Sequence, residues 1–277
     1  MKNTQMCKDK YIMAEGVCYH VKVIGKGRPL VWLHGFSEDS TTWNKINIPG
    51  YESFFVDLIG HGKSERKVQL NYYMMESVLK QLETVINELI STCYSIIGYS
   101  MGGRLALAYA LRHRENIEKL VLESSGFGIK DRCEKNKRRN SEKKLAENIK
   151  KEGIIWFEEY WSKLDIFSTQ LKLDKQIIRE IKKRRLNNSE VALANTLLGL
   201  GQGVSPYYGM ALQGLQIPTI YVSGELDKKY VELGKEIEEI NVNIKSYQIE
   251  GAGHNVHLER ATNFTRVIAG FLSAETF

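Results

Sequence analysis

The chain has 277 residues, of which 43% are hydrophobic and 26% charged, an ordinary balance for a folded globular protein with a large core. No stretch approaches the roughly 18 apolar residues of a membrane span, and residues 1–16 carry charges instead of the apolar core of a signal peptide. The four cysteines match no metal or disulfide spacing, which favours a reducing compartment. These features predict a cytoplasmic protein without a metal site or a membrane association.

The net charge of +6 is concentrated in one segment. Residues 126–205 contain 18 Lys and Arg against 11 Asp and Glu, whereas the rest of the chain contains 21 against 22. Such a segment fits a solvated helical surface, a nucleic-acid patch or a lid over an anionic small molecule. Because no nucleic-acid-binding motif accompanies the charge, we expect no nucleic-acid partner.

The first predicted elements form an antiparallel hairpin at the edge of a sheet. Residues 17–23 alternate as a half-buried strand does, and Glu15-Gly16 marks the turn from a preceding strand. An apolar run over 29–33 then predicts a central parallel strand that ends in His34-Gly35-Phe36. Loops at the carboxyl ends of parallel strands share one edge of the sheet, so we expect this loop at the active edge.

Strands then alternate with helices, which is typical of a parallel sheet with crossover helices. The patterns predict strands over 54–57, 95–99 and 119–123, and helices over 71–90 and 104–112.

Residues 126–205, called the cap segment below, have the pattern of charged amphipathic helices. The sheet resumes near 218–223 and 244–249, and a closing helix covers 261–272. We therefore predict an α/β core of residues 1–125 and 206–277, with a mostly parallel sheet, helices on both faces and an inserted helical cap.

The strand over 95–99 runs into Gly98-Tyr99-Ser100-Met101-Gly102, the Gly-x-Ser-x-Gly pattern of a nucleophile elbow. Small flanking residues tolerate the strained serine that such a turn requires. The following helix points its N-terminus at Ser100, so the backbone N–H of Met101 can stabilise an oxyanion there. The backbone N–H of Phe36 is the expected second donor.

Two further candidates follow later strands, namely Asp227 and His254. Ser100, Asp227 and His254 occur in the chain order of a catalytic triad. His254 would accept the serine proton, and Asp227 would hold the imidazole in the correct tautomer. Glu123 and Glu225 are rival acids.

The other histidines offer weaker candidates for catalysis. His20 and His113 are expected at the surface, and His61 and His257 have no evident acid partner in the sequence. Arg104 lies one helical turn after Ser100 and can face the same pocket, where a guanidinium suits carboxylates.

Several motifs, in order along the chain, carry a resemblance to a known family. They are HGFS at 34–37, GHGKS at 60–64, GYSMGGR at 98–104, GLGQG at 199–203, GELDK at 224–228 and GAGHNVH at 251–257. The chain resembles the menaquinone-pathway lyases of the α/β-hydrolase fold, the 2-succinyl-6-hydroxy-2,4-cyclohexadiene-1-carboxylate synthases. Ile59, Gly126-Phe127 and Ala261 depart from prolines that are often found at these points of the family, and none of them belongs to the triad.

The resemblance implies elimination of pyruvate from an enolpyruvoyl succinyl-cyclohexene carboxylate, without a metal or an organic cofactor. It assigns the triad to Ser100, Asp227 and His254, and the oxyanion hole to the N–H groups of Phe36 and Met101.

The resemblance also implies residues that bind the substrate. They are Arg104, Arg138 and Arg185 for its carboxylates, with Tyr99 and Trp161 lining the pocket. Arg132 or Arg139 could be the true counterpart of Arg138, and Arg184 that of Arg185. The implied partner is an anionic small molecule with several carboxylates, bound by a monomer or a weak homo-oligomer.

A Ser-His-Asp triad by itself can catalyse other reactions equally well. A carboxylesterase or a carbon–carbon bond hydrolase would use Ser100 as a covalent nucleophile. A fold without catalysis could act as a binding protein, although the intact order of Ser100, Asp227 and His254 argues against that.

Overall fold

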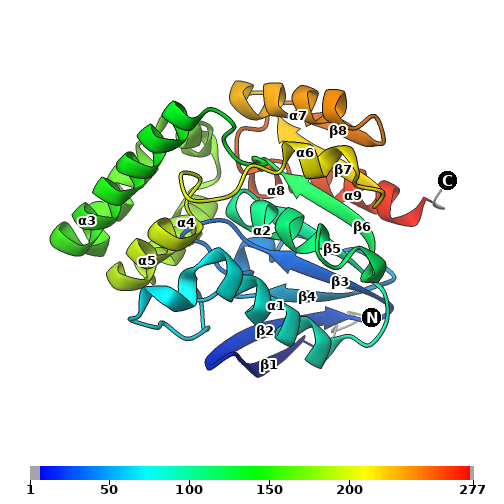
Figure 1. Ribbon diagram of the computed structural model, residues 1–277, viewed down its shortest axis with the longest axis horizontal. Helices are drawn as coiled ribbons and strands as arrows, with labels where there is room; N and C mark the ends of the chain where they lie inside the picture. The colour runs from blue at the N-terminus through cyan, green and yellow to red at the C-terminus, as the bar shows by residue number, and fades with distance from the viewer. Residues whose placement is uncertain (1–6, 275–277) are drawn as a thin grey trace.

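The computed structural model describes residues 7–274, and these contain one eight-stranded sheet with helices on both faces (Figure 1). The strands are β1 (Cys7–Ala14), β2 (Val17–Gly25), β3 (Arg28–Leu33), β4 (Tyr51–Val56), β5 (Tyr94–Tyr99), β6 (Ile117–Glu123), β7 (Thr219–Gly224) and β8 (Ile244–Ile249). They lie in the order β1-β2-β4-β3-β5-β6-β7-β8. β2 runs antiparallel to β1 and β4, and all the other neighbours are parallel.

The helices divide between the two sequence regions. The core contains α1 (Met75–Leu89), α2 (Met101–Ala110), α6 (Gly209–Gln213), α7 (Lys228–Ile240), α8 (Val256–Glu259) and α9 (Ala261–Ser273). The cap segment contains α3 (Arg132–Ser162), α4 (Lys175–Leu186) and α5 (Glu190–Leu200), and no strand. Short 3-10 turns occupy Ser40–Trp43, Leu70–Tyr73, Arg114–Asn116 and Asp165–Lys172. Figure 1 shows α3, α4 and α5 together beyond one end of the sheet. Within residues 7–274, no helix is both long enough and apolar enough to cross a membrane.

The predicted α/β class, edge hairpin and mostly parallel sheet are confirmed, whereas two helix boundaries differ. α2 begins at Met101 instead of 104, because the helix starts directly after the elbow. The helix predicted over 71–90 is a 3-10 turn followed by α1, because Met74 has an extended backbone (φ −67°, ψ 143°) between them. The division into core and cap stays a prediction.

Alternate residues of β3 enter different cores, as the two-residue period of a strand requires. Val31 and Leu33 belong to a cluster with residues of α1, α2 and α7. Leu30 and Trp32 belong to a second cluster with residues of α9. The strands are therefore covered on both faces, and their carboxyl ends are left as the edge where a site can form.

The cap segment has a small core of its own, made by α3 and α5 (Ala146, Ile149, Phe157, Leu193, Ala194 and Leu197). Phe36, from the loop after β3, packs against this cluster and against the main core. Gly153 interrupts α3 with a non-helical backbone (φ 87°, ψ 177°). The next N–H, of Ile154, donates to Glu190 Oε1 at 3.3 Å, so a side chain at the start of α5 caps the second half of α3.

The expectation that His20 lies at the surface is wrong, because its exposed fraction is 1%. Its Nδ1 lies 2.7 Å from Asp57 Oδ2, and its Nε2 lies 3.0 Å from Asp9 Oδ1. Burial alone would lower the pKa of His20, but the hydrogen bonds with the two aspartates outweigh burial and raise it. The imidazole thus joins β1, β2 and the loop after β4.

We predict that His20→Gln lowers the free energy of unfolding by about 1.5–3 kcal/mol in mild acid, since it removes hydrogen bonds to charged groups. Because the folded-state pKa of His20 is raised, its contribution to stability is complete below the unfolded-state pKa near 6.5. This contribution is lost as the pH rises through the folded-state pKa. Urea unfolding at about pH 5.5 and about pH 9 measures the difference between wild type and variant. An equal difference at both pH values would contradict a charged His20.

Candidate active site

Ser100 lies at the turn between β5 and α2, with φ 51° and ψ −105°, outside the regions that L-residues favour. The turn is shaped by two glycines that lie very close to backbone atoms of neighbouring segments. A Cβ at Gly98 would lie 2.3 Å from Gly102 O, and a Cβ at Gly102 would lie 2.2 Å from Leu33 O. Only glycine fits at either position, which explains the Gly-x-Ser-x-Gly pattern in physical terms.

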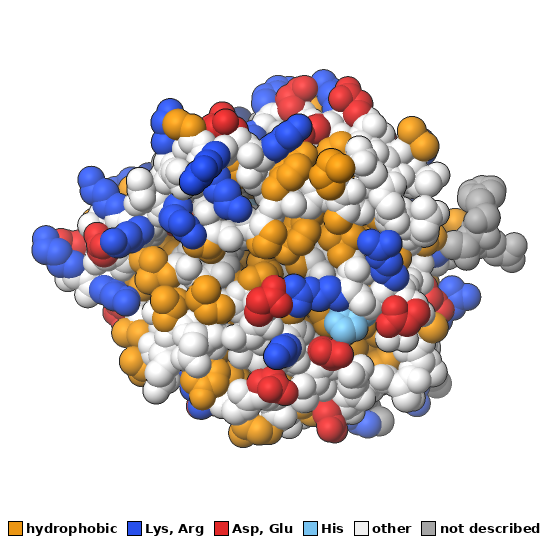
Figure 2. All heavy atoms as spheres, in the orientation of Figure 1, with side chains coloured by type: hydrophobic (Ala, Val, Ile, Leu, Met, Phe, Trp, Pro, Cys, Tyr) orange, Lys and Arg blue, Asp and Glu red, His pale blue; other side chains and the backbone are white. Residues whose placement is uncertain are grey.

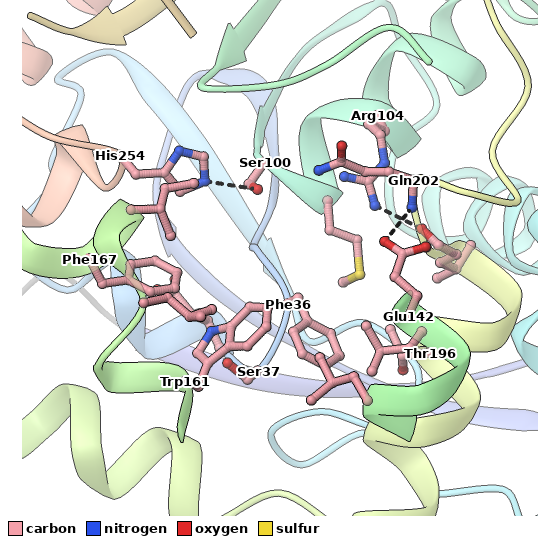
Figure 3. Close-up of a pocket in the computed structure, with 18 of the residues that line it drawn as sticks. Phe36, Ser37, Ser100, Arg104, Glu142, Trp161, Phe167, Thr196, Gln202 and His254 are labelled. Carbon is pink, nitrogen blue, oxygen red and sulfur yellow. Dashed lines mark hydrogen bonds between the residues drawn. The ribbon is translucent and has the colours of Figure 1, made fainter. Parts of the chain in front are cut away.

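The structure brings Ser100, His254 and Asp227 together beyond the ends of β5, β8 and β7. Figure 3 shows His254 facing Ser100. His254 Nε2 lies 3.2 Å from Ser100 Oγ, and His254 Nδ1 lies 2.7 Å from Asp227 Oδ2. A neutral imidazole that donates its Nδ1–H to Asp227 has a free lone pair on Nε2, facing the serine hydroxyl. This arrangement can take a proton from Ser100 or, through Ser100, from a bound molecule.

The two rival acids have other partners. Glu225 Oε2 accepts a hydrogen bond from the N–H of Gly251 at 2.9 Å. Glu123 accepts one from the N–H of His257 at 3.0 Å, and its Oε2 lies 2.8 Å from His257 Nδ1. The expectation that His257 lacks an acid partner is therefore wrong. Burial lowers the pKa of His257 to about 3 and raises that of Glu123, so it disfavours charge on both groups.

A buried carboxylate holds the loop that carries His254. Glu259 accepts hydrogen bonds from the N–H of Gly253 at 2.7 Å and from the N–H of Asn255 at 3.2 Å. The Asn255 amide in turn donates to Glu38 Oε1 at 2.7 Å. The residues on both sides of His254 are thus fixed.

A neutral histidine supports the loop after β3. Ser37 has φ 63°, in the left-handed region, and its N–H donates to His61 Nε2 at 3.3 Å. His61 Nδ1 donates to Ile59 O at 2.9 Å, which leaves Nε2 as the acceptor. Burial lowers the pKa of His61 to about 3, so this acceptor keeps its lone pair at neutral pH.

A cavity of about 240 Å³ lies next to Ser100, between the loops of the core and the cap segment (Figure 3). It is lined by every predicted site residue except Asp227, namely Phe36, Tyr99, Ser100, Met101, Arg104, Arg138, Trp161, Arg185 and His254. The N–H of Met101 belongs to the first turn of α2, where no helical carbonyl can accept it. Among the described residues, no three His, Cys, Asp or Glu side chains gather in a way that could hold a metal ion.

The structure distinguishes the alternative arginines by position. Arg138 and Arg185 line the cavity, whereas Arg132 lines a neighbouring one. Arg139 and Arg184 line neither of the two.

Two of the lining arginines are buried and bonded only to neutral groups. Arg104 has an exposed fraction of 6%, and its Nη2 donates to Leu200 O at 2.7 Å. Arg185 has an exposed fraction of 4% and donates to Gln170 Oε1 at 3.1 Å, with its guanidinium 4.9 Å from the centre of the Phe167 ring. Burial lowers the pKa of both arginines. An anion in the cavity would offset that unfavourable burial of positive charge.

Sequence reasoning missed several other lining residues, namely Glu38, Glu142, Phe167, Gln202, Lys229 and Tyr230. The GLGQG motif was an available signal for Gln202, and Lys229 and Tyr230 follow directly after the predicted Asp227. Glu142 lies in a Lys- and Arg-rich stretch that offers no such signal.

Comparison with known proteins places the fold and the family. Residues 28–261 match the sequence model of the alpha/beta hydrolase fold. The chain is 30% identical over 266 residues to a Bacillus subtilis (strain 168) protein provisionally named 2-succinyl-6-hydroxy-2,4-cyclohexadiene-1-carboxylate synthase, a match covering 95% of this chain and 97% of that one. It is 32% identical over 247 residues to the Photorhabdus laumondii synthase of the same name, covering 88% and 85% of the two chains. The chain belongs to this synthase family of the α/β-hydrolase fold.

A solved structure supports the same placement. The structure of MenH from S. aureus matches this chain with a TM-score of 0.85 and 30% identity, covering 97% of this chain and 98% of that one. The resemblance predicted from the motifs is therefore confirmed at the level of the family.

We predict that His61→Leu lowers the free energy of unfolding at about pH 7.5 by about 1–3 kcal/mol, because the Ser37 N–H loses its acceptor. Because the folded-state pKa of His61 is about 3, its contribution to stability is present above the unfolded-state pKa near 6.5. This contribution falls as the pH drops below 6.5, where the unfolded chain binds a proton that the folded chain does not. Urea unfolding should therefore give a difference between wild type and variant that narrows on acidification, opposite in sign to His20→Gln. A difference that widens in acid would contradict a neutral His61.

Proposed function

We propose that this chain eliminates pyruvate from 2-succinyl-5-enolpyruvoyl-6-hydroxy-3-cyclohexene-1-carboxylate and so forms 2-succinyl-6-hydroxy-2,4-cyclohexadiene-1-carboxylate in menaquinone biosynthesis. The observation that carries the proposal is a triad geometry that shares one cavity with three arginines, in a chain whose relatives bear the name of this product. The proposed location is the cytoplasm, in keeping with four cysteines that are all free thiols.

The two compound names define the bond changes. The substrate has its ring double bond at position 3 and the enolpyruvoyl oxygen at position 5, whereas the product has double bonds at positions 2 and 4. A proton therefore leaves carbon 2, the double bond shifts, and the carbon–oxygen bond at carbon 5 breaks. Carbon 2 bears the succinyl carbonyl, so loss of its proton gives an enolate. The leaving enolpyruvate gains a proton and becomes pyruvate, so no net proton is consumed.

The triad residues fit the proton transfers of this reaction. Ser100 and His254, 3.2 Å apart, would remove the proton from carbon 2, and Asp227 would stabilise the imidazolium that forms. The N–H groups of Phe36 and Met101 would stabilise the negative charge on the enolate oxygen. His254 would then return its proton to the enolpyruvate.

The arginines fit the anionic groups of the substrate, which carries three carboxylates, on the ring, the succinyl group and the enolpyruvoyl group. Arg104, Arg138 and Arg185 line the same cavity and offer planar donors suited to carboxylates. Tyr99 and Trp161 supply aromatic walls for the ring. Burial raises the pKa of Tyr99 well above its ordinary value, so its hydroxyl stays protonated.

The experiment that tests the proposal follows pyruvate release by purified protein from the enolpyruvoyl substrate. We expect one pyruvate for each diene formed, and Ser100→Ala should lower turnover by roughly two to four orders of magnitude, not additively with His254→Ala. Mass spectrometry during turnover should find no acylated Ser100. A stable acyl adduct, or turnover of simple aryl esters without pyruvate release, would favour a carboxylesterase or carbon–carbon bond hydrolase that uses the same triad.

We predict that replacing Arg104, Arg138 or Arg185 with Ala lowers kcat/KM on the order of ten- to a hundredfold, since each change removes a charge-assisted hydrogen bond of roughly 1.5–3 kcal/mol. Replacement with Lys should recover only part of this loss, because an ammonium keeps the charge and loses the planar fork.

Exposed lysines of α3 provide the control for the arginine variants. Figure 2 shows Lys and Arg side chains gathered over α3, and both Lys143 and Lys150 are exposed there. Their replacement by Ala should change only the salt dependence of the association rate. If the arginine variants kept full kcat/KM while the lysine variants lost it, a diffuse basic surface would replace the proposed receptor.

A further inference from the structure

Glu142 is an unexpected group in a cavity proposed to bind anions. Its exposed fraction is 5%, and it projects from α3 into the wall of the cavity (Figure 3). A negative charge there opposes an anionic ligand by simple electrostatics. The presence of Glu142 must therefore be explained by the hydrogen-bond donors that its carboxylate binds.

Both oxygens of Glu142 are occupied by N–H donors from two parts of the chain. Oε1 accepts from Arg138 Nε at 2.7 Å and from the N–H of Gln202 at 2.9 Å. Oε2 accepts from the N–H of Gly203 at 2.9 Å. One carboxylate thus joins a lining arginine on α3 to the loop after α5.

The loop is shaped to receive this carboxylate. A Cβ at Gly201 would lie 2.4 Å from Glu142 Oε2, and a Cβ at Gly203 would lie 2.3 Å from the backbone N of Arg139. These approaches account for two glycines of the GLGQG motif. At the last residue of α5, directly before this loop, Leu200 O accepts from Arg104 Nη2, so the end of α5 also contacts α2.

The bond to Nε determines how Arg138 can meet a ligand. Because Nε is used by Glu142, the two terminal amino groups of the guanidinium remain for a carboxylate. Holding Nε fixes the plane of the guanidinium, which lowers the entropy lost on binding. The Arg138 side chain is 39% exposed, so without this bond it would be free to turn toward solvent.

We propose that Glu142 is a positioning residue that increases affinity for the anionic substrate by fixing the Arg138 guanidinium and the Gln202–Gly203 backbone. This inference rests on the proposed function, and it assigns to a buried anion a favourable effect on anion binding. Glu142 itself takes no part in the chemistry.

The charge of Glu142 and its positioning role predict opposite results for Glu142→Gln. If the side chain acted only through its charge, its neutralisation would lower KM for the enolpyruvoyl substrate. Positioning predicts a rise in KM on the order of tenfold, with little change in kcat, because a charge-assisted hydrogen bond is weakened. Glu142→Asp, which keeps the charge and shortens the reach, should raise KM as well. Glu147→Gln, which removes an exposed charge from the same helix, should leave KM unchanged.

Glu142→Gln in the Arg138→Ala variant tests whether Glu142 acts through Arg138. In Arg138→Ala protein, Glu142→Gln should raise KM by clearly less than it does in wild type, as expected for groups that act together. A KM that falls or stays constant in Glu142→Gln would overturn the inference, and so would an equal rise in both backgrounds.

Hydrogen exchange separates this inference from the proposed function. The N–H groups of Gln202 and Gly203 should exchange faster in Glu142→Gln than in wild type, at matched thermal stability and without any substrate present. Unchanged exchange would overturn the inference whatever the enzyme does. Absence of pyruvate release by the wild-type protein would instead reject the proposed function, while faster exchange would still support the clamp on the loop.

Discussion

The close backbone contact between the end of β5 and the start of α2 determines the geometry around Ser100. With no side chain at Gly98 or Gly102, α2 begins at once after the strand, and the N–H of Met101 is brought beside Ser100. The same approach brings Gly102 against Leu33 O, so the loop after β3 lies next to the serine. One packed junction therefore sets the relative positions of hydroxyl, helix N-terminus and loop. The strained serine costs roughly 1–3 kcal/mol, which the two surrounding cores must offset.

The cationic side chains that line the cavity, Arg104, Arg138, Arg185 and Lys229, outnumber the lining carboxylates, Glu38 and Glu142, so the lining carries a net positive charge. Glu123 and Glu259 accept backbone N–H groups of the segment that carries His254. Arg104 and Arg185 donate to a carbonyl and to an amide, so no protein carboxylate neutralises them through a hydrogen bond. Arg138 differs, because its bond to Glu142 partly compensates its charge. In the proposed function, these two buried cations would bind an incoming anion, and Glu142 would position the third.

Elements and site candidates that follow from the local sequence pattern and from strand order could be predicted from the sequence. Contacts between residues far apart in the chain could not. The elbow and the candidates Asp227 and His254 follow from where strands end, because parallel strands bring those ends to one edge. Asp57 lies 37 residues from its partner His20, and Gln202 lies 60 residues from its partner Glu142, and nothing in the local alternation or composition marks these two pairs. Adjacent cap arginines could not be distinguished either, because neighbours on a helix point about 100° apart and the sequence leaves the cavity-facing side open.

The buried histidines also determine how many protons the chain exchanges with solvent when it folds. On acidification below about pH 6.5, an unfolded chain binds protons at two sites, His61 and His257, that the folded chain leaves empty. On the alkaline side, the raised pKa of His20 means that the folded chain holds a proton at this site more tightly than the unfolded chain does. Each full proton of difference changes stability by about 1.4 kcal/mol per pH unit, so His61 and His257 lower stability as the pH falls below about 6.5, and His20 lowers it as the pH rises above that value. Through these three groups, acidification therefore destabilises the fold at two sites and alkalinisation at one.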